Sequence, residues 1–266
     1  MCRPLLTKGR PPRTYRACFP CGSREKIAAT TREKFSAANF EMLQDRQSQD
    51  RHRVIAIDGP AASGKSSVAR ELARRLGFVY VNSGAMYRAM TWHVLQHGAS
   101  PNDAGRVAEL ADTARVICDL RNREGHVLID DVDPTEHLCD ERVNQAVSFI
   151  SSVPQVRKVI VEELRNYSRD YDLVMEGRDI GSVVFPDTPY KFYIDASPEV
   201  RLQRRAAQGQ RDEIATRDRA DSSRAASPLV VARDAEVIDS SHLTIEGVVN
   251  EIMRRLEAKG LQKGKE

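Results

Sequence analysis

A loop with two glycines, a lysine and a serine is the part of this sequence best suited to chemistry. It reads Gly59-x-x-x-x-Gly64-Lys65-Ser66, the spacing of a phosphate-binding P-loop. Backbone N–H groups can wrap around phosphate oxygens only where little side chain intervenes, and the lysine and serine then supply a charge and an Mg²⁺ ligand. The sequence therefore predicts that a nucleoside triphosphate binds along Gly59, Pro60, Ala61, Ala62, Ser63, Gly64, Lys65, Ser66 and Ser67.

Arginines recur at the ends of the predicted strands and helices. Phosphoryl transfer between two anions needs several cations, which offset like-charge repulsion and stabilise the transferred group. Each arginine taken alone is more often a solvated surface residue, so the functional interpretation depends on its setting. The sequence has no guanine-reading Asn-Lys-x-Asp motif, which argues against a GTPase. The arginines concerned are Arg88, Arg157, Arg178, Arg217 and Arg224.

Two polar segments follow predicted strands and so lie at the same edge of the predicted sheet. Residues 83–88 follow the second strand and residues 176–181 the third. In α/β folds the carboxyl ends of the strands form the edge at which ligands bind. Glu176 and Asp179 beside a glycine-flanked arginine suit the binding of a small polar ligand better than core packing.

The elements that must position these residues alternate between strand and helix. The first four are strand 53–58, helix 64–76, strand 78–81 and helix 83–97, with Ser83 as the expected cap of the second helix and Gly98 as its stop. This alternation predicts an α/β fold in which helices cover a parallel sheet. The later core strands are expected at 173–175, 191–195 and 236–238, which makes five, with helices starting near Pro154, Pro198 and Ile245.

The stretch 101–147 breaks this alternation. A helix at 108–114 is followed by two short strand-like runs, at 114–119 and 125–129, which are joined by a turn-like segment. We interpret the stretch as an inserted αβ module within a single core domain, because 266 residues are too few for two large domains.

Charge is unevenly distributed along the chain, whose formal net charge is +3. Residues 1–53 carry 12 Lys+Arg against 5 Asp+Glu, whereas residues 54–266 carry 29 against 33. The globular part is thus slightly acidic, which argues against a nucleic-acid partner. No apolar stretch approaches the length of about 18 residues that a membrane span needs, so we expect a soluble protein with no membrane partner.

The first 52 residues are rich in Arg, Pro, Ser and Gln and are predicted to be a disordered basic extension. An organellar transit peptide and a true start downstream, at Met42, are alternatives that the sequence leaves open.

The five cysteines are few and irregularly spaced, which suits a reducing cytoplasm. Cys18 and Cys21 form the one close pair, and incidental thiols are favoured over a metal site because no second ligand pair lies near them.

Four motifs together resemble the bacterial cytidylate kinases. They are residues 59–67, 82–88 and 176–186 and the run Arg217-Asp218-x-x-Asp221-Ser222-x-Arg224, and the resemblance extends over about residues 53–257. It implies a P-loop NTPase three-layer sandwich with a five-stranded parallel core sheet. It also implies a nucleoside-monophosphate-binding insert at about 101–147, a mobile lid at about 201–217 and a polar tail at 258–266.

The resemblance implies transfer of the γ-phosphate of ATP to CMP or dCMP with Mg²⁺, by a monomeric cytoplasmic enzyme. Lys65, Arg178 and Arg217 would be catalytic, and Ser66 would bind the metal. Residues for the acceptor would divide into three groups: Ser83, Arg157, Asp179 and Arg224 for the cytosine, Ser148, Arg217 and Asp221 near the sugar, and Arg88 and Arg178 for the α-phosphate. Lid arginines expected to close over the transferred group are Arg201, Arg204, Arg205 and Arg211.

Two departures from the family pattern and two rival functions remain. Asn82 stands where the family commonly has an acidic or hydroxyl-bearing residue, so a nearby water or cation contact is expected to differ. The lid is short, with 11 residues between Arg205 and Arg217. A P-loop kinase for UMP or another small acceptor is the alternative enzyme, and a nucleotide-dependent regulatory or nucleic-acid-binding protein that uses the basic extension is the alternative class.

Overall fold

One mixed sheet organises the residues that the computed structural model describes, 52–207 and 229–261. Its seven strands run in the order β3-β4-β2-β5-β1-β6-β7. The five expected core strands are confirmed, and they are parallel to one another. They are β1 (Val54–Asp58), β2 (Val79–Asn82), β5 (Leu173–Gly177), β6 (Tyr190–Asp195) and β7 (Glu236–Asp239).

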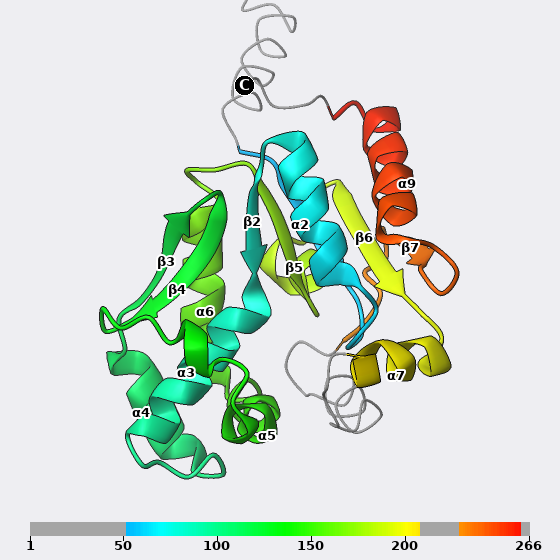
Figure 1. The fold of residues 1–266 in the computed structure, drawn as a ribbon. Helices are drawn as coiled ribbons and strands as arrows, with labels where there is room; N and C mark the ends of the chain where they lie inside the picture. The colour runs from blue at the N-terminus through cyan, green and yellow to red at the C-terminus, as the bar shows by residue number, and fades with distance from the viewer. Residues whose placement is uncertain (1–51, 208–228, 262–266) are drawn as a thin grey trace, which may run out of the picture. The chain divides into compact units, whose positions relative to one another are not determined.

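Helices cover both faces of this sheet (Figure 1). Side chains alternate between the two faces of a strand, so in β1 Val54 and Ala56 pack into one core while Ile55 and Ile57 pack into the other. The second core contains α2 (Lys65–Leu76) and α9 (Ile245–Ala258), and the first contains α3 (Ser83–Gln96) and α6 (Pro154–Tyr167). The expected three-layer α/β sandwich is confirmed.

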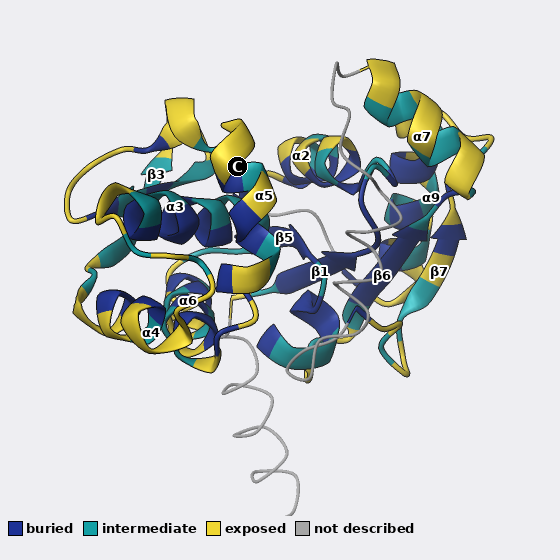
Figure 2. Cartoon of the chain, turned by 90° about the horizontal axis from the view of Figure 1, so that it is seen from below, coloured by how far each residue is buried: buried dark blue, intermediate teal, exposed yellow. Residues whose placement is uncertain are grey.

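Burial is deepest in the central strands, as Figure 2 shows for β1, β5 and β6. Every residue of β1 and β5 is buried. The sequences of such strands are nearly continuous runs of apolar residues, because helices cover both of their faces. Their buried positions fix the carboxyl ends of the strands, from which the loops of the site depart.

The stretch expected to form an inserted module contributes strands to the main sheet. It contains α4 (Ala104–Thr113), followed by a hairpin of β3 (Val116–Arg121) and β4 (Glu124–Ile129). Asn122 and Arg123 both have positive φ values, 52° and 62°, which suit the tight turn of a hairpin. Strand β4 lies parallel to β2 through the pair Tyr80 and Glu124, so the sheet is wider than the five expected strands.

Most residues expected to begin or end a helix do so in the structure, and one expected cap is wrong. Gly77 caps the end of α2, and Pro154 is the first residue of α6. The cap of α3 is Asn82 rather than Ser83, because the Asn82 side chain accepts a hydrogen bond from the Ala85 N–H at 3.1 Å. Asn82, which departs from the family pattern, thus caps the N-terminus of α3.

The sequence analysis missed a helix, α5 (Glu141–Ile150), which follows the short turn η1 (Thr135–His137). Val143, Ala146, Val147 and Ile150 are buried at helical spacing. This spacing is visible in the sequence and could have predicted the helix. Helix α5 brings a second wall to the site described below.

Other expectations fall partly or wholly outside the described residues. These are the extension, Cys18 and Cys21, the part of the lid after α7 (Pro198–Ala207), and residues 262–266 of the tail. Leu261 is buried in the core with α2 and α9, so the packed domain extends past residue 257. Within 52–207 and 229–261, none of the helices has both the length and the apolar character needed to cross a membrane.

Candidate phosphoryl-transfer site

The predicted phosphate loop connects β1 to α2 and is tightly packed. Gly59 has φ +153°, and a Cβ at this position would lie 2.1 Å from the Ile194 carbonyl oxygen, so a side chain does not fit. Gly64 has φ +91° and caps the start of α2. Ala62 also has a positive φ of 60°, which strains a residue with a side chain. The loop places the N-terminus of α2 at the site, and the first N–H groups of a helix have no acceptor within the helix itself.

Lys65, Ser66 and Glu176 form a small cluster at the start of α2 and the end of β5. Ser66 Oγ donates a hydrogen bond to Glu176 Oε1 at 2.7 Å. Lys65 Nζ lies 3.9 Å from Glu176 Oε2 and donates to the Pro60 carbonyl at 3.1 Å. The Tyr80 hydroxyl donates to Glu176 at 3.3 Å, and burial together with this carboxylate raises the pKa of Tyr80. A cation, a hydroxyl and a carboxylate thus meet beside the phosphate loop.

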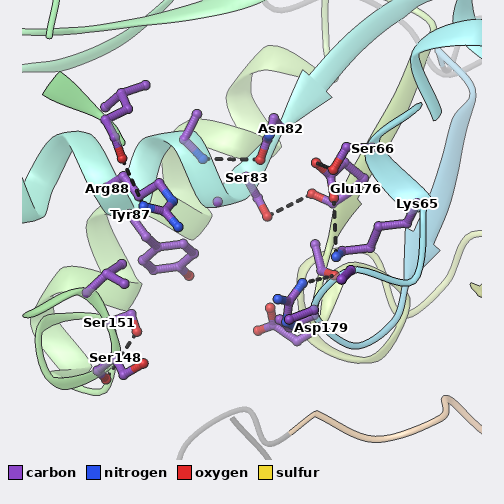
Figure 3. A pocket seen from close by; sticks show the side chains of 18 of the residues that line it. Lys65, Ser66, Asn82, Ser83, Tyr87, Arg88, Ser148, Ser151, Glu176 and Asp179 are labelled. Carbon is purple, nitrogen blue, oxygen red and sulfur yellow. Dashed lines mark hydrogen bonds and ion pairs between the residues drawn. The ribbon is translucent and has the colours of Figure 1, made fainter. Parts of the chain in front are cut away.

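A cavity of about 370 Å³ extends from this cluster toward α3, α5 and α6. Figure 3 shows Lys65 and Ser66 on one side of it and Arg88 and Ser148 on the other. Most of the described site residues expected from the sequence line it: Ala61, Ala62, Gly64, Lys65, Ser66, Ser67, Ser83, Arg88, Ser148, Arg157, Arg178 and Asp179. Gly59, Pro60 and Ser63 do not line the cavity but belong to the loop that bounds it.

Arg157 and Asp179 form a buried ion pair at the cavity wall. Arg157 also donates to the Ser151 carbonyl at 3.3 Å and lies over the Tyr87 ring at 5.3 Å. Burying two charges carries a large desolvation penalty, which is offset only when the two groups pair closely and make further hydrogen bonds. A buried pair with this geometry is therefore a specific feature of the site and not ordinary core packing. It places charged hydrogen-bonding groups at the cavity wall.

Three further predicted residues take positions around this pair. Ser83 Oγ donates to the Glu176 carbonyl at 2.9 Å, which joins the start of α3 to the end of β5. Arg178 is half-buried and lines the cavity. Arg88, also half-buried, donates through Nη1 to the Leu138 carbonyl at 2.8 Å and to Asn144 Oδ1 at 2.6 Å. The arginines expected for a phosphate thus lie at the same cavity as the buried ion pair.

Asp58, the last residue of β1, is a functional candidate that the sequence analysis missed. Its two carboxylate oxygens accept hydrogen bonds from the Ile180 and Gly181 N–H groups, each at 2.8 Å. Burial, reinforced by nearby Asp179, raises the pKa of Asp58 from 3.8 to about 6, although the two hydrogen bonds act in the opposite direction. Asp58 therefore ties the start of the phosphate loop to the turn that carries Asp179. Asp58 directly precedes Gly59 at the end of a predicted strand, and this position could have marked it as a candidate from the sequence.

The expected lid arginines separate into different roles. Arg201 donates to the Ala61 carbonyl at 3.3 Å, and Arg204 donates to the Ser63 carbonyl at 3.1 Å, so both hold the backbone of the phosphate loop. Arg205 lines the cavity. Four expected residues lie outside the described part of the chain: Arg211, Arg217, Asp221 and Arg224.

Helix α5 and the segments on either side of it supply lining residues that were not named from the sequence. Leu138, Cys139, Val147 and Ser151 line the cavity, and Asn144 contacts Arg88 from the same helix. These residues carry no motif of their own. The helical spacing of the buried residues of α5 could have placed them on one wall.

A parallel core sheet covered by helices, with a P-loop after its first strand that faces arginines across one cavity, defines the class of P-loop kinases for small acceptors. The family profile described as cytidylate kinase matches residues 55–258, and the chain belongs to the cytidylate kinase family.

Curated relatives agree with this membership. The chain is 44% identical over 217 residues to the cytidylate kinase of Pelotomaculum thermopropionicum, which covers 77% of this chain and 96% of that protein. It is 42% identical over 212 residues to the cytidylate kinase of Mycobacterium leprae, with 75% and 93% covered. A solved shikimate kinase from Acinetobacter baumannii aligns over 81% of this chain and 99% of that chain, at 14% identity and a TM-score of 0.42, a likeness too weak to bear on the site.

Proposed function

We propose that this chain transfers the γ-phosphate of ATP to CMP or dCMP, giving ADP and CDP or dCDP. The observation that carries the proposal is the single cavity that joins the phosphate loop to the buried Arg157–Asp179 pair. A donor loop alone is common to many ATPases and GTPases. A second polar site on the far side of the same cavity supports transfer to a bound acceptor.

On the donor side, the phosphates of ATP would lie along the loop at the N-terminus of α2, with Lys65 near the outer phosphates. Ser66 and Glu176 would hold the divalent cation, for which we propose Mg²⁺. Their hydroxyl and carboxylate oxygens are adjacent and suit this cation, which binds few protein ligands and keeps several waters. When bound, the cation would neutralise charge on the phosphates.

On the acceptor side, Asp179 would accept a hydrogen bond from the exocyclic amine of cytosine, and Arg157 would donate to the ring acceptors. Ser83, whose hydroxyl hydrogen is donated to the Glu176 carbonyl, would contact the base through its oxygen as an acceptor. Uracil has an acceptor where cytosine has its amine, so the buried carboxylate would face it unfavourably. Arg88 and Arg178 would hold the α-phosphate. The sugar would lie near Ser148, Arg217 and Asp221, with Arg224 toward the base.

In the transfer step, an oxygen of the CMP phosphate would attack the γ-phosphorus of ATP as the bond to the β-phosphate oxygen breaks and ADP leaves. This exchange needs no protein nucleophile. Lys65, Arg178 and Arg217 would contribute by positioning the two phosphates and stabilising charge in the transition state.

A coupled assay of ADP release tests this function across CMP, dCMP, UMP, AMP, GMP and TMP. We expect turnover with CMP and dCMP well above that with UMP, since discrimination against a mispaired buried polar group is large. Phosphorylation of none of the six would refute the proposal. A preference for UMP would support the alternative, a P-loop kinase for UMP or another small acceptor.

We further propose that the region 101–147 is the monophosphate-binding insert and that residues from about 201 to 217 act as a lid over the transferred phosphoryl group. We also propose that the protein is a cytoplasmic monomer without a nucleic-acid partner. The slightly acidic charge of residues 54–266 supports the absence of a nucleic-acid partner.

Expression of the protein from Met42 tests whether the basic N-terminal extension is needed. Unchanged activity and solubility would mark residues 1–41 as dispensable.

A further inference from the structure

Asn144, on α5, connects three parts of the acceptor side of the cavity. Its Oδ1 accepts a hydrogen bond from Arg88 Nη1 at 2.6 Å, and its Nδ2 donates to the Cys139 carbonyl at 2.8 Å. Its backbone N–H donates to the Asp140 carbonyl at 2.9 Å. One side chain thus joins an arginine of α3 to the segment that leads into α5.

The contact orients the guanidinium group of Arg88. A guanidinium nitrogen such as Nη1 carries two N–H bonds, and here both have acceptors: Asn144 Oδ1 and the Leu138 carbonyl oxygen at 2.8 Å. The two acceptors come from different elements, so they fix the plane of the group from two directions. Leu138 lines the cavity, so this orientation is set at the cavity wall.

Such orientation favours phosphate binding for an entropic reason. A free arginine side chain has many rotamers, and immobilising a long side chain on binding costs about 0.5–1.5 kcal/mol. An arginine that is already held does not incur this cost when the anion arrives. Its planar group also meets the phosphate in a geometry that permits paired hydrogen bonds.

We propose that Asn144 is a positioning residue for the acceptor phosphate, holding Arg88 so that its guanidinium meets the phosphate group of a nucleoside monophosphate. This inference rests on the proposed function. The side chain of Asn144 acts through Arg88 and through the segment containing Leu138 and Cys139. Its neutrality is part of the role, because a carboxylate at this position would bind the guanidinium as an ion and compete with the phosphate.

The test compares the dissociation constants of CMP and cytidine, which differ by the phosphate, measured by calorimetry with cytidine as a competitor. For Asn144→Ala we expect CMP to bind about 3- to 10-fold more weakly, from the cost of ordering Arg88 on binding, while cytidine is unaffected. Asn144→Asp should weaken CMP further and again leave cytidine unaffected. Alanine favours helix formation, so Asn144→Ala should fold, and thermal unfolding of both variants checks this.

Gln145→Ala is the matched control. Gln145 is the next residue on α5, also carries an amide, is exposed, and donates within the helix to Glu141 at 3.1 Å. We expect this variant to bind both ligands as the unaltered protein does. An equal effect of Gln145→Ala and Asn144→Ala on CMP would overturn the inference.

Two other results would overturn it as well. Equal weakening of CMP and cytidine in Asn144→Ala would show a general effect on the cavity wall, and unchanged CMP binding would show that Arg88 needs no help from Asn144. Failure of the proposed function is separate, because it appears in the unaltered protein as a lack of CMP phosphorylation and of any preference for CMP over cytidine.

Discussion

The two sides of the cavity are built in different ways. The donor side is one continuous loop, residues 59–67, whose backbone shape is fixed by close packing against Ile194 and by positive φ angles. The acceptor side is assembled from side chains of α3, α5, α6 and the turn after β5, which are far apart in the sequence. A phosphate chain can be bound by a local motif, whereas a base must be bound by groups that only the tertiary fold brings together.

The difference also predicts how each side responds to substitution. Backbone N–H groups persist when a side chain changes, so the donor side depends on few side chains, above all Lys65. The acceptor side contains a buried ion pair, and removing one member leaves the other charge buried without its partner. We expect donor-side substitutions to affect turnover and acceptor-side substitutions to affect both selectivity and stability.

The largest expected effect is that of Lys65→Ala, on the donor side. Loss of its charge near the outer phosphates should lower kcat by about 100- to 1000-fold, as for other preorganised charge-stabilising groups. Steady-state kinetics with CMP measures this, and CMP binding by calorimetry should be nearly unchanged. Turnover equal to that of the unaltered protein would contradict the P-loop assignment.

On the acceptor side, Asp179→Ala should reduce the preference for CMP over UMP by at least about 10-fold, because the proposed hydrogen-bond acceptor for the cytosine amine is lost. The KM for ATP should change little. The free energy of unfolding should fall by about 3 kcal/mol, since Arg157 stays buried without its carboxylate. Substrate competition and urea unfolding measure the two effects, and an unchanged CMP-to-UMP ratio would count against the role of Asp179.

Asp58 lies between the two sides, and its titration should appear in stability. The pKa of about 6 in the folded protein exceeds the ordinary 3.8, so the folded state binds the proton more tightly than the unfolded state. The contribution of this group to stability is therefore full below pH 3.8 and is lost as the pH rises through about 6. The difference corresponds to about 3 kcal/mol.

Asp58→Asn removes this titration. Relative to the variant, the unaltered protein should gain unfolding free energy as the pH is lowered from 8 to 4, approaching that 3 kcal/mol. Urea unfolding of both proteins at pH 8, 6 and 4 measures it. A constant difference between the two proteins across this range would show that Asp58 is not the titrating group.

The smallest expected effect concerns the donor loop itself. Ala62 has φ 60°, a conformation that glycine adopts without strain, so Ala62→Gly should raise the free energy of unfolding by about 1 kcal/mol with little change in kcat. Ala61→Gly is the matched control, because Ala61 is buried and is not among the residues with positive φ. It should lower stability instead, and equal effects of the two substitutions would contradict the strain at Ala62.

The sequence predicted the phosphate loop and the strand and helix that flank it, because their signals are local: glycines at a fixed spacing, a buried strand before them and a helix after them. The parallel strands followed from apolar runs for the same reason. On the acceptor side, Ser148 was chosen only through resemblance to a family, and the same resemblance gave Arg157 its expected role. Neither residue carries a local signal that it faces Asp179 or the cavity. The structure places both at the cavity.

Apart from helix α5, whose helical spacing is a local signal, the features that were not predicted from the sequence depend on contacts between distant segments. The hydrogen bonds of Asp58 to the Ile180 and Gly181 N–H groups span more than 100 residues, and those of Asn144 to Arg88 span two helices. The cap of α3 was assigned to Ser83, yet Ser83 donates to the Glu176 carbonyl, and Asn82 takes the capping position. For Asp58, Asn144 and Ser83, tertiary packing determined which polar group the side chain contacts.

The central claim is that donor and acceptor occupy one cavity at the same time. An inhibitor in which adenosine and cytidine are joined through five phosphates tests it directly, because it must span both sides. We expect steady-state inhibition by this compound to be competitive toward both ATP and CMP. Inhibition competitive toward ATP but noncompetitive toward CMP would contradict it.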